Sequence, residues 1–190
     1  MTTSYLNVRE FYKGKTILIS GCTGFLGKII LEKIIRTCSD FKTIYVLVRR
    51  KQGMTLDARM KKDIYESQLF KYLFEKRPEL IKLCKERVIP VQGDLIAEAL
   101  GMEPAVREMM KNEVEVIINS AASIDMNGSI HEMLQIDYFG PKRMLDFAHE
   151  CKNLRVFNHI STAYVNSNQK PWSIISEKIH PNTGAEDFEV

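Results

Sequence analysis

Three glycines at a spacing of three residues give this sequence its clearest chemical signal. Glycine lets the main chain turn tightly and approach a ligand closely, because it has no Cβ atom. Such a turn can present backbone N–H groups to the phosphates of a nucleotide, at the positive end of a helix. We therefore predict a phosphate site whose residues are Gly21, Thr23, Gly24, Phe25, Leu26 and Gly27.

A strand and a helix must hold this turn in place. Residues 15–20 form an aliphatic, strand-like run, and apolar residues at helical spacing follow the turn to about Cys38. We expect Gly21 to supply backbone freedom at the end of the strand, Gly24 to let the main chain approach a pyrophosphate, and Gly27 to bring the helix close to the strand. The spacing differs from the commonest fingerprint, G-x-G-x-x-G, so the flanking strand and helix are what favour nucleotide binding over an incidental turn.

Two arginines follow the next strand-like run, residues 43–48. The end of this strand is where a dinucleotide site recognises the adenosine ribose, with an acid for the 2′-hydroxyl of NAD or an arginine for the 2′-phosphate of NADP. Arg49 and Arg50 stand here, and the next acid along the chain is Asp57. Because a guanidinium can hold a phosphate with two hydrogen bonds, these arginines predict NADPH as the cofactor. The alternative is a basic surface loop that is simply solvated.

The ends of three further strands supply the remaining candidates. These strands are expected at residues 88–92, 114–118 and 154–160. Ligands of open parallel sheets bind at the carboxyl ends of the strands. Small residues at the second of these ends would let a cofactor pass close by, and the acid at the first is either a ligand contact or the acceptor of an Asx turn. The candidates are Asp94, Leu95, Ser120, Ala121, Ala122 and Ser161.

Helical patterns alternate with these strands, which predicts an α/β fold. A long crossover spans residues 55–86 and is broken at Pro78, a shorter helix is expected at residues 104–111, and Ser129 can cap a helix that runs to about residue 151. The expected architecture is a Rossmann-type doubly wound parallel sheet in the order 3-2-1-4-5, incomplete at its C-terminal side. The fifth strand would then lie at an edge.

Two local features qualify this scheme. Residues 1–10 show no periodicity and are expected to form a loose arm. Pro141 lies inside the last helical pattern, where it would remove one hydrogen bond and kink the helix. Residues 1–190 are expected to form a single NAD(P)-binding domain, an N-terminal portion without a substrate-binding or C-terminal domain.

Composition excludes several other functions. The chain has 190 residues, 45% of them hydrophobic, which is enough for one domain with a sizeable core. A net charge of +3 with interleaved acids and bases gives no stripe for nucleic acid. Four cysteines without a C-x-x-C pair, and no paired histidines, predict free thiols in a reducing compartment and no metal site. No segment reaches the roughly 18 apolar residues of a membrane span.

Five motifs, in order, resemble those of the extended short-chain dehydrogenase/reductases, and within them most of all the fatty acyl-CoA reductases. The motifs are Phe-Tyr-Lys-Gly-Lys-Thr-Ile-Leu from residue 11, Gly-Phe-Leu-Gly-Lys from 24, Ile-Tyr-Val-Leu-Val-Arg from 44, Val-x-Gly-Asp-Leu from 91 and His-Ile-Ser-Thr-Ala-Tyr-Val-Asn from 159. The resemblance implies that NADPH reduces a long-chain acyl-CoA through an aldehyde to a fatty alcohol, with release of CoA.

The resemblance also implies roles for single residues. Asp94 would lie by the adenine ring and accept from its exocyclic amine. Ser161 would polarise the substrate oxygen with its hydroxyl; the alternatives are that Thr162 supplies this hydroxyl or that Ser161 only caps the strand end. Where the family usually has an Asn, this chain has Asp137, which keeps an acceptor and loses a donor. Any water relay through that position is therefore in doubt.

The proton donor of such reductases is a Tyr with a Lys four residues later, on the helix after the fifth strand. Tyr164 fails this test, because Asn168 stands at the required spacing. We therefore expect the chain to stop before its own proton donor.

Several alternatives stay open. One is another extended reductase, such as a carrier-protein thioester reductase or a sugar-nucleotide epimerase. Another is a non-catalytic, truncated NADPH-binding module, which the missing Tyr-x-x-x-Lys favours. By resemblance the protein is intracellular, either cytoplasmic or at the peroxisomal or endoplasmic reticulum membrane, since the family is often membrane-associated.

Overall fold

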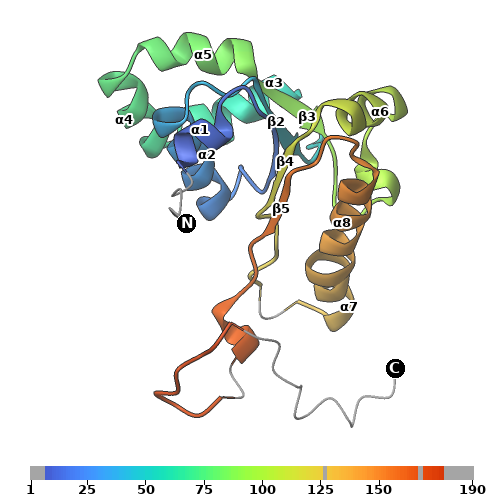
Figure 1. Cartoon of the computed structure of the whole chain (residues 1–190). Helices are drawn as coiled ribbons and strands as arrows, with labels where there is room; N and C mark the ends of the chain where they lie inside the picture. The colour runs from blue at the N-terminus through green and yellow to red at the C-terminus, as the bar shows by residue number, and fades with distance from the viewer. Residues whose placement is uncertain (1–6, 126–127, 167–168, 178–190) are drawn as a thin grey trace. The chain divides into compact units, whose positions relative to one another are not determined.

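Five strands pair in parallel to form one open sheet, in the order β3-β2-β1-β4-β5 (Figure 1). The computed structural model describes residues 7–125, 128–166 and 169–177. This strand order is the predicted one, so the Rossmann-type fold is confirmed. The strands are β1 Thr16–Ser20, β2 Thr43–Val48, β3 Val88–Gln92, β4 Val116–Asn119 and β5 Val156–His159.

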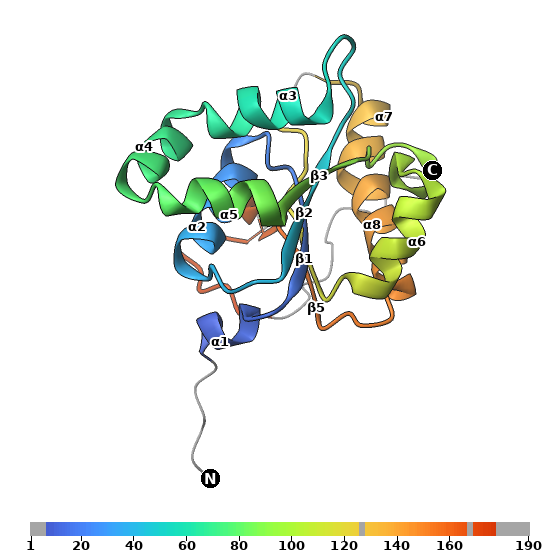
Figure 2. The ribbon, with the colours of Figure 1, turned by 90° about the horizontal axis from the view of Figure 1, so that it is seen from above.

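Helices cover both faces of this sheet (Figure 2). One layer contains α2, α4 and α5, and the other contains α6, α7 and α8, with α8 against β4 and β5. The helices are α1 Val8–Tyr12, α2 Phe25–Thr37, α3 Leu56–Met60, α4 Gln68–Lys76, α5 Glu79–Arg87, α6 Pro104–Glu113, α7 Ile130–Met133 and α8 Gly140–Glu150. Shorter turns are the π-helical η1 Lys61–Tyr65 and η3 Leu134–Phe139 and the 3-10 helices η2 Glu98–Gly101 and η4 Ala163–Asn166.

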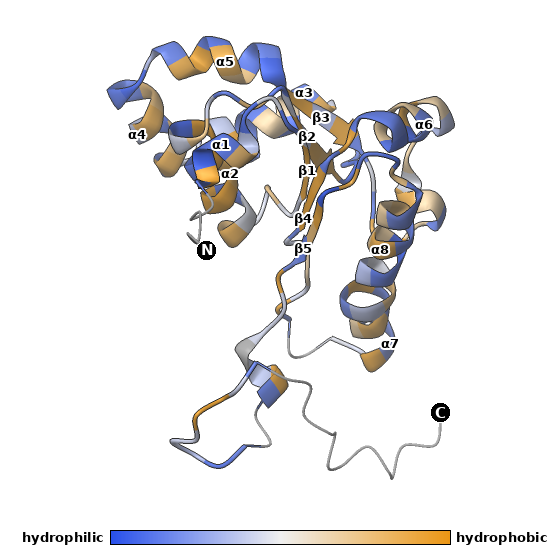
Figure 3. Ribbon diagram, in the orientation of Figure 1, coloured by the Kyte–Doolittle hydropathy of each residue, from blue (hydrophilic) through white to orange (hydrophobic). Residues whose placement is uncertain are grey.

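The core lies where the central strands meet the two helical layers. Ile17, Leu18 and Ile19 of β1 are fully buried, as expected for a strand covered on both faces. Figure 3 shows the strands as a hydrophobic centre between helices whose outer surfaces are largely hydrophilic. Because β1 is held in the core on both faces, the turn that follows it has a fixed position.

The strand limits agree with the sequence except at β4 and β5. Residues 43–48 and 88–92 are strands with the predicted bounds. The strand expected at 114–118 begins later, because the Val114 N–H still bonds to the Met110 carbonyl and ends α6. The strand expected at 154–160 covers only Val156–His159, and its side chains are largely exposed, as the predicted edge position requires.

One of two local expectations needs correction. Residues 8–10 are not a loose arm: they belong to the short helix α1, because the Asn7 side chain caps it by accepting from the Arg9 N–H. The helix through Pro141 contains a π-helical segment. The π-helical η3 leads directly into α8 with Phe139 and Gly140 both in the right-handed helical region, so Pro141 lies within a continuous helical stretch to which it donates no hydrogen bond, as expected.

The chain divides into two compact units, the first ending at His159 and the second beginning at Ile160. The second unit contains η4, and Asn168 lies outside the described residues. Within the described parts of the chain, no helix is long and apolar enough to cross a membrane. In the same parts, no group of three or more His, Cys, Asp or Glu side chains could hold a metal ion.

Candidate nucleotide-binding site

The glycine turn is shaped by contacts that leave no room for a side chain at two of its three glycines. Gly21 has φ +77°, which favours glycine, and a Cβ atom there would lie 2.7 Å from the backbone of Ser120 and Ala121. A Cβ atom at Gly27 would lie 2.9 Å from the Cys22 nitrogen and closer still to the Gly21 carbonyl. Both predictions for these glycines are therefore confirmed: one turns the chain and the other brings α2 against β1.

Gly24 differs from the other two glycines. A Cβ atom there would meet only the Gly21 carbonyl oxygen, at 3.2 Å, and its φ of −83° suits any residue. Packing within the protein therefore does not demand a glycine at this position. The residue is exposed at the start of α2, so the space a side chain would fill is the space outside the turn, where a ligand would lie.

The start of α2 offers unpaired backbone donors to that space. Gly24 is its N-cap residue, and no side chain caps the helix. The first N–H groups of a helix have no intrahelical partner, and the helix dipole favours an anion beside them. Phe25 and Leu26 are 84% and 46% exposed, so the helix end is open to solvent. This arrangement fits a bound pyrophosphate.

A buried hydroxyl ties the end of β1 to the end of β4. Ser20 Oγ accepts from the backbone N–H groups of Ser120 and Ala121, both at 3.1 Å, and donates to Asn119 Oδ1 at 2.5 Å. The Asn119 amide nitrogen in turn lies 3.2 Å from His159 Nδ1 at the end of β5. These bonds hold the carboxyl ends of three neighbouring strands together.

The sequence did not assign a role to these three polar side chains. The only signal was a serine directly before Gly21 and an asparagine directly before Ser120, each at the end of an apolar strand. The bonded residues Ser20 and Asn119 are 99 positions apart in the chain, and Asn119 and His159 are 40 positions apart. Only the strand order brings them together.

Ser120 is the candidate with an unsatisfied group. Its hydroxyl oxygen is buried and has no hydrogen-bond partner among the described residues. Leaving a buried polar group unpaired costs about 1–3 kcal/mol. An additional donor or acceptor at the carboxyl end of β4 would remove that cost, which fits a polar ligand in this place.

The two arginines after β2 are exposed and lie in a loop that a third arginine holds. Arg49 and Arg50 follow the buried strand directly, and their side chains are in solvent. Arg59 of α3, whose side chain is only 13% exposed, donates to the Arg49 carbonyl and pairs with Asp63 at 3.1 Å. The role of Arg59 was missed, because nothing in the sequence shows that α3 folds back on this loop.

Asp94 forms the Asx turn that the sequence offered as one alternative. Its Oδ1 atom accepts from the Ile96 N–H at 3.2 Å, and its second carboxylate oxygen accepts no hydrogen bond from the residues that the structure describes. Leu95 beside it is only 7% exposed, and its side chain packs in the core.

Cys22, inside the glycine turn, is not a nucleophile candidate. It is fully buried, and burial raises the pKa of its thiol far above the usual range. Cys38, Cys84 and Cys151 are also free and buried. The four thiols are therefore structural.

Ser161 and Thr162 belong to the second unit of the chain, and both are exposed. Thr162 makes local bonds: its hydroxyl accepts from the Tyr164 N–H at 3.2 Å, and its carbonyl accepts from the Val165 N–H at 3.4 Å. The hydroxyl of Thr162 still has its O–H to donate, so Ser161 and Thr162 both stay candidates for a substrate contact.

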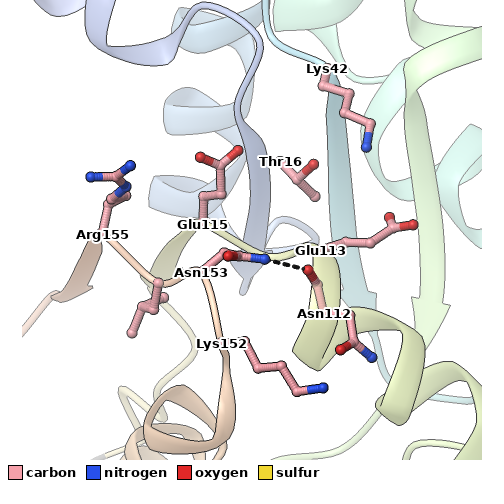
Figure 4. Close-up of a pocket in the computed structure, with 9 residues that line it drawn as sticks. Thr16, Lys42, Asn112, Glu113, Glu115, Lys152, Asn153 and Arg155 are labelled. Carbon is pink, nitrogen blue, oxygen red and sulfur yellow. Dashed lines mark hydrogen bonds between the residues drawn. The ribbon is translucent and has the colours of Figure 1, made fainter.

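A hollow of about 500 Å³ lies at the other end of the sheet, where the strands begin (Figure 4). Its two acidic side chains, Glu113 and Glu115, are paired within the protein. Glu115 forms a 2.7 Å salt bridge with Lys15, Glu113 accepts from the Tyr45 hydroxyl at 2.8 Å, and the Asn153 amide donates to the Asn112 carbonyl at 2.7 Å. These contacts connect the loops below the sheet, away from the glycine turn.

Comparison with known proteins decides the family. Residues 19–188 match the family described as male sterility protein, an NAD-binding domain family. The chain belongs to the male sterility protein family. The match covers the glycine turn, all strands after β1 and the region that contains Ser161. The predicted NAD(P)-binding Rossmann domain is thereby confirmed.

Relatives of this male sterility family chain agree with the resemblance found in the motifs. Fatty acyl-CoA reductase 1 of Gallus gallus is 35% identical over 176 residues, which are 93% of this chain and 33% of that protein. The probable fatty acyl-CoA reductase 5 of Arabidopsis thaliana is 36% identical over 176 residues, 91% of this chain and 35% of that protein. The chain thus spans about a third of the length of these relatives.

Among solved structures, the terminal R domain from the myxalamid PKS-NRPS biosynthetic pathway is similar to this chain. The two share 25% identity with a TM-score of 0.64, over 80% of this chain and 36% of that chain. The reductase (R) domain of a nonribosomal peptide synthetase from Mycobacterium tuberculosis gives a TM-score of 0.62 at 25% identity, over 82% of this chain and 35% of that chain. The fold is that of reductase domains.

Proposed function

We propose that this chain is the NADPH-binding part of a fatty acyl-CoA reductase, which reduces a long-chain acyl-CoA to a fatty alcohol. The observation that carries the proposal is the similarity to fatty acyl-CoA reductases over 93% of the chain, together with a glycine turn whose middle glycine faces open space. Because the chain covers a third of those relatives, the activity, the substrate and CoA release are proposals for the whole protein.

The cofactor would lie across the carboxyl ends of the strands. The pyrophosphate would bind beside Gly24 and the first N–H groups of α2, and Ser120 to Ala122 would line its path. Asp94 would accept from the adenine amine. Arg49 and Arg50 would hold the 2′-phosphate and make the site selective for NADPH. When bound, the cofactor supplies the hydride.

One residue of this chain, Ser161, would orient the substrate. Ser161 would donate a hydrogen bond to the thioester or aldehyde oxygen, which stabilises the negative charge that develops there. The general acid would come from a Tyr-x-x-x-Lys outside these 190 residues. The 190-residue chain alone is therefore proposed to bind NADPH without turnover.

A carrier-protein thioester reductase is the second candidate. The observation that favours it is the similarity in structure to R domains of peptide synthetase pathways. Both candidates present a thioester to the same hydroxyl, and they differ in whether CoA or a carrier protein holds the acyl group. A long-chain acyl-CoA and an acylated carrier protein, offered separately, distinguish the two.

We infer an intracellular location for this protein, in the cytoplasm or at the peroxisomal or endoplasmic reticulum membrane. The support is the resemblance to fatty acyl-CoA reductases. Fractionation of cells that express the tagged protein checks it, and recovery of the protein in the medium would contradict it.

NADPH consumption with a long-chain acyl-CoA tests the proposed activity. The 190-residue chain is compared with a version extended through the next Tyr-x-x-x-Lys of its gene. The extended protein should turn over, and Ser161→Ala in it should lower kcat by about 10²- to 10³-fold, the cost of losing one donor to a developing negative charge, whereas Thr162→Ala, the matched control, should have a small effect. Equal turnover by the short and extended chains, or a silent Ser161→Ala, would overturn these assignments.

A further inference from the structure

The loop that follows β3 adopts a backbone conformation that needs support from other elements of the protein. Ala99 and Leu100 have φ of 50° and 61°, in the left-handed region that non-glycine residues rarely adopt. The loop is closed by a 2.7 Å hydrogen bond from the Asp94 N–H to the Leu100 carbonyl. Such conformations persist only where neighbouring structure holds them. The place of the Asp94 carboxylate therefore depends on what holds this loop.

Arg143 of α8 is one such support. Its Nη1 atom donates to the Leu95 carbonyl at 3.3 Å. The residue is half-buried, so this bond is shielded from competing water. Because Leu95 directly follows Asp94, the bond fixes the main chain beside the carboxylate.

Arg143 is itself held by the π-helical segment before α8. Its Nη2 atom donates to Gln135 Oε1 at 3.3 Å, and its guanidinium lies 5.9 Å from the centre of the Phe139 ring. The planar guanidinium can serve both oxygens at once with separate N–H groups. A lysine has one nitrogen and cannot reproduce this geometry.

The helix also approaches the loop closely at Gly140. A Cβ atom at Gly140 would lie 3.1 Å from Leu95 Cβ, so a larger residue would push the loop away. Leu95 and Leu100 are both buried in the core, at 7% and 1% exposure. Side-chain packing and the Arg143 bond thus act on the same short stretch of chain.

We propose that Arg143 is a positioning residue for recognition of the adenine base: it holds the Leu95 carbonyl so that the Asp94 carboxylate faces the exocyclic amine. The inference rests on the proposed binding of NADPH. Arg143 itself contacts no ligand in this scheme. Its effect should therefore be confined to the adenine end of the cofactor.

The test measures discrimination between two bases. Dissociation constants are determined for NADPH and for its hypoxanthine analogue, in which an oxygen replaces the amine that Asp94 would accept from. The wild-type chain should bind NADPH about tenfold more tightly than the analogue, as expected for a hydrogen bond to a charged group. Arg143→Met, which keeps the packing on Phe139 but has no donor, should bring the two constants close together.

Further variants separate positioning from folding. Arg143→Gln, whose shorter side chain ends before the positions of both Nη atoms, should lose discrimination in the same way and decides the matter if Arg143→Met does not fold. Arg143→Lys should retain part of it. Lys142→Ala is the matched control, since Lys142 is the exposed neighbour that pairs with Asp146, and it should leave the ratio unchanged. The preference for NADPH over NADH should be the same in all variants.

The outcomes separate this inference from the proposed function. A wild-type chain that binds no NADPH overturns both. A wild-type chain that prefers NADPH tenfold over the analogue, with the same ratio in a folded Arg143→Met or Arg143→Gln, overturns the role of Arg143 alone. A wild-type chain that binds NADPH and the analogue equally also overturns it, because Asp94 then does not recognise the base.

Discussion

The hydroxyl of Ser20 on β1 donates a 2.5 Å hydrogen bond to the side-chain carbonyl of Asn119 on β4. The same oxygen accepts from two backbone N–H groups beyond β4, so one buried side chain satisfies three polar groups. The relationship places the residues after β4 directly against Gly21. The candidate cofactor site therefore depends on a bond between two strands that the sequence separates by 99 residues.

Ser20→Ala should destabilise the fold. The substitution leaves the Asn119 carbonyl and two backbone N–H groups without their buried partner, and each such loss costs about 1–3 kcal/mol. We expect the free energy of unfolding in urea to fall by at least that amount, with Ser20→Thr recovering most of it. Ser173→Ala, at an exposed position, is the control. An unchanged urea midpoint for Ser20→Ala would show that the bond carries no stability.

Gly24→Val should abolish dinucleotide binding and leave the fold intact. The new Cβ atom would meet only the Gly21 carbonyl oxygen within the protein, at 3.2 Å, and the methyl groups beyond it are expected to occupy the space proposed for the pyrophosphate. Gly27→Ala is the contrast, because its Cβ atom would collide with the backbone of Gly21 and Cys22 and should lower the melting temperature. Circular dichroism and NADPH titration separate the two effects. Unchanged NADPH affinity in Gly24→Val would mean that the site lies elsewhere.

Stability should fall at alkaline pH, in part through Tyr45. Burial, and then the bond to Glu113, raise the pKa of its hydroxyl from 10.0 to about 12. The native state therefore holds this proton more tightly than the unfolded chain. The contribution to stability is complete below pH 10 and is lost as the pH rises from 10 to 12.

The Tyr45 contribution can be measured by urea unfolding at several pH values between about 9 and 12. This range spans the reference pKa values of tyrosine and cysteine and the raised value of Tyr45 in the fold. Tyr45→Phe should lose about 1 kcal/mol at neutral pH, the value of one hydrogen bond, and should depend less steeply on pH. The buried thiols of Cys84 and Cys151, with pKa values raised to about 12 and about 11, act in the same direction and remain in the variant. An equally steep loss in Tyr45→Phe would assign the effect to the other groups whose pKa values are raised, these thiols and Tyr65 among them.

The sequence predicted the parts of the fold that local patterns control. Continuous apolar runs such as residues 43–48 mark buried parallel strands, and Gly21 and Gly27 are glycines because the backbone passes too close for any side chain. The limits of β4 and β5 were less accurate, because they depend on where α6 ends and on the edge position of β5.

The contacts that organise the candidate site could not be predicted in the same way. The partners of Ser20, Arg59 and Arg143 come from other elements, and no periodicity in the chain reveals them. The π-helical segment before α8 was also missed, since its sequence differs little from that of an ordinary amphipathic helix. Pairing of distant polar groups is a property of the assembled sheet rather than of any segment.

Calorimetric titration of the 190-residue chain with NADPH and with NADH tests the central claim most directly. If Arg49 and Arg50 hold the 2′-phosphate, NADPH should bind more tightly by about 1.5 to 3 kcal/mol, the range for hydrogen bonds to charged groups. Arg49→Glu should reverse the order, because a carboxylate repels the phosphate and accepts from the 2′-hydroxyl. Lys51→Glu is the matched control for the change of charge in the same loop and should keep the order. Equal affinities for NADPH and NADH, or no saturable binding of either, would contradict the account.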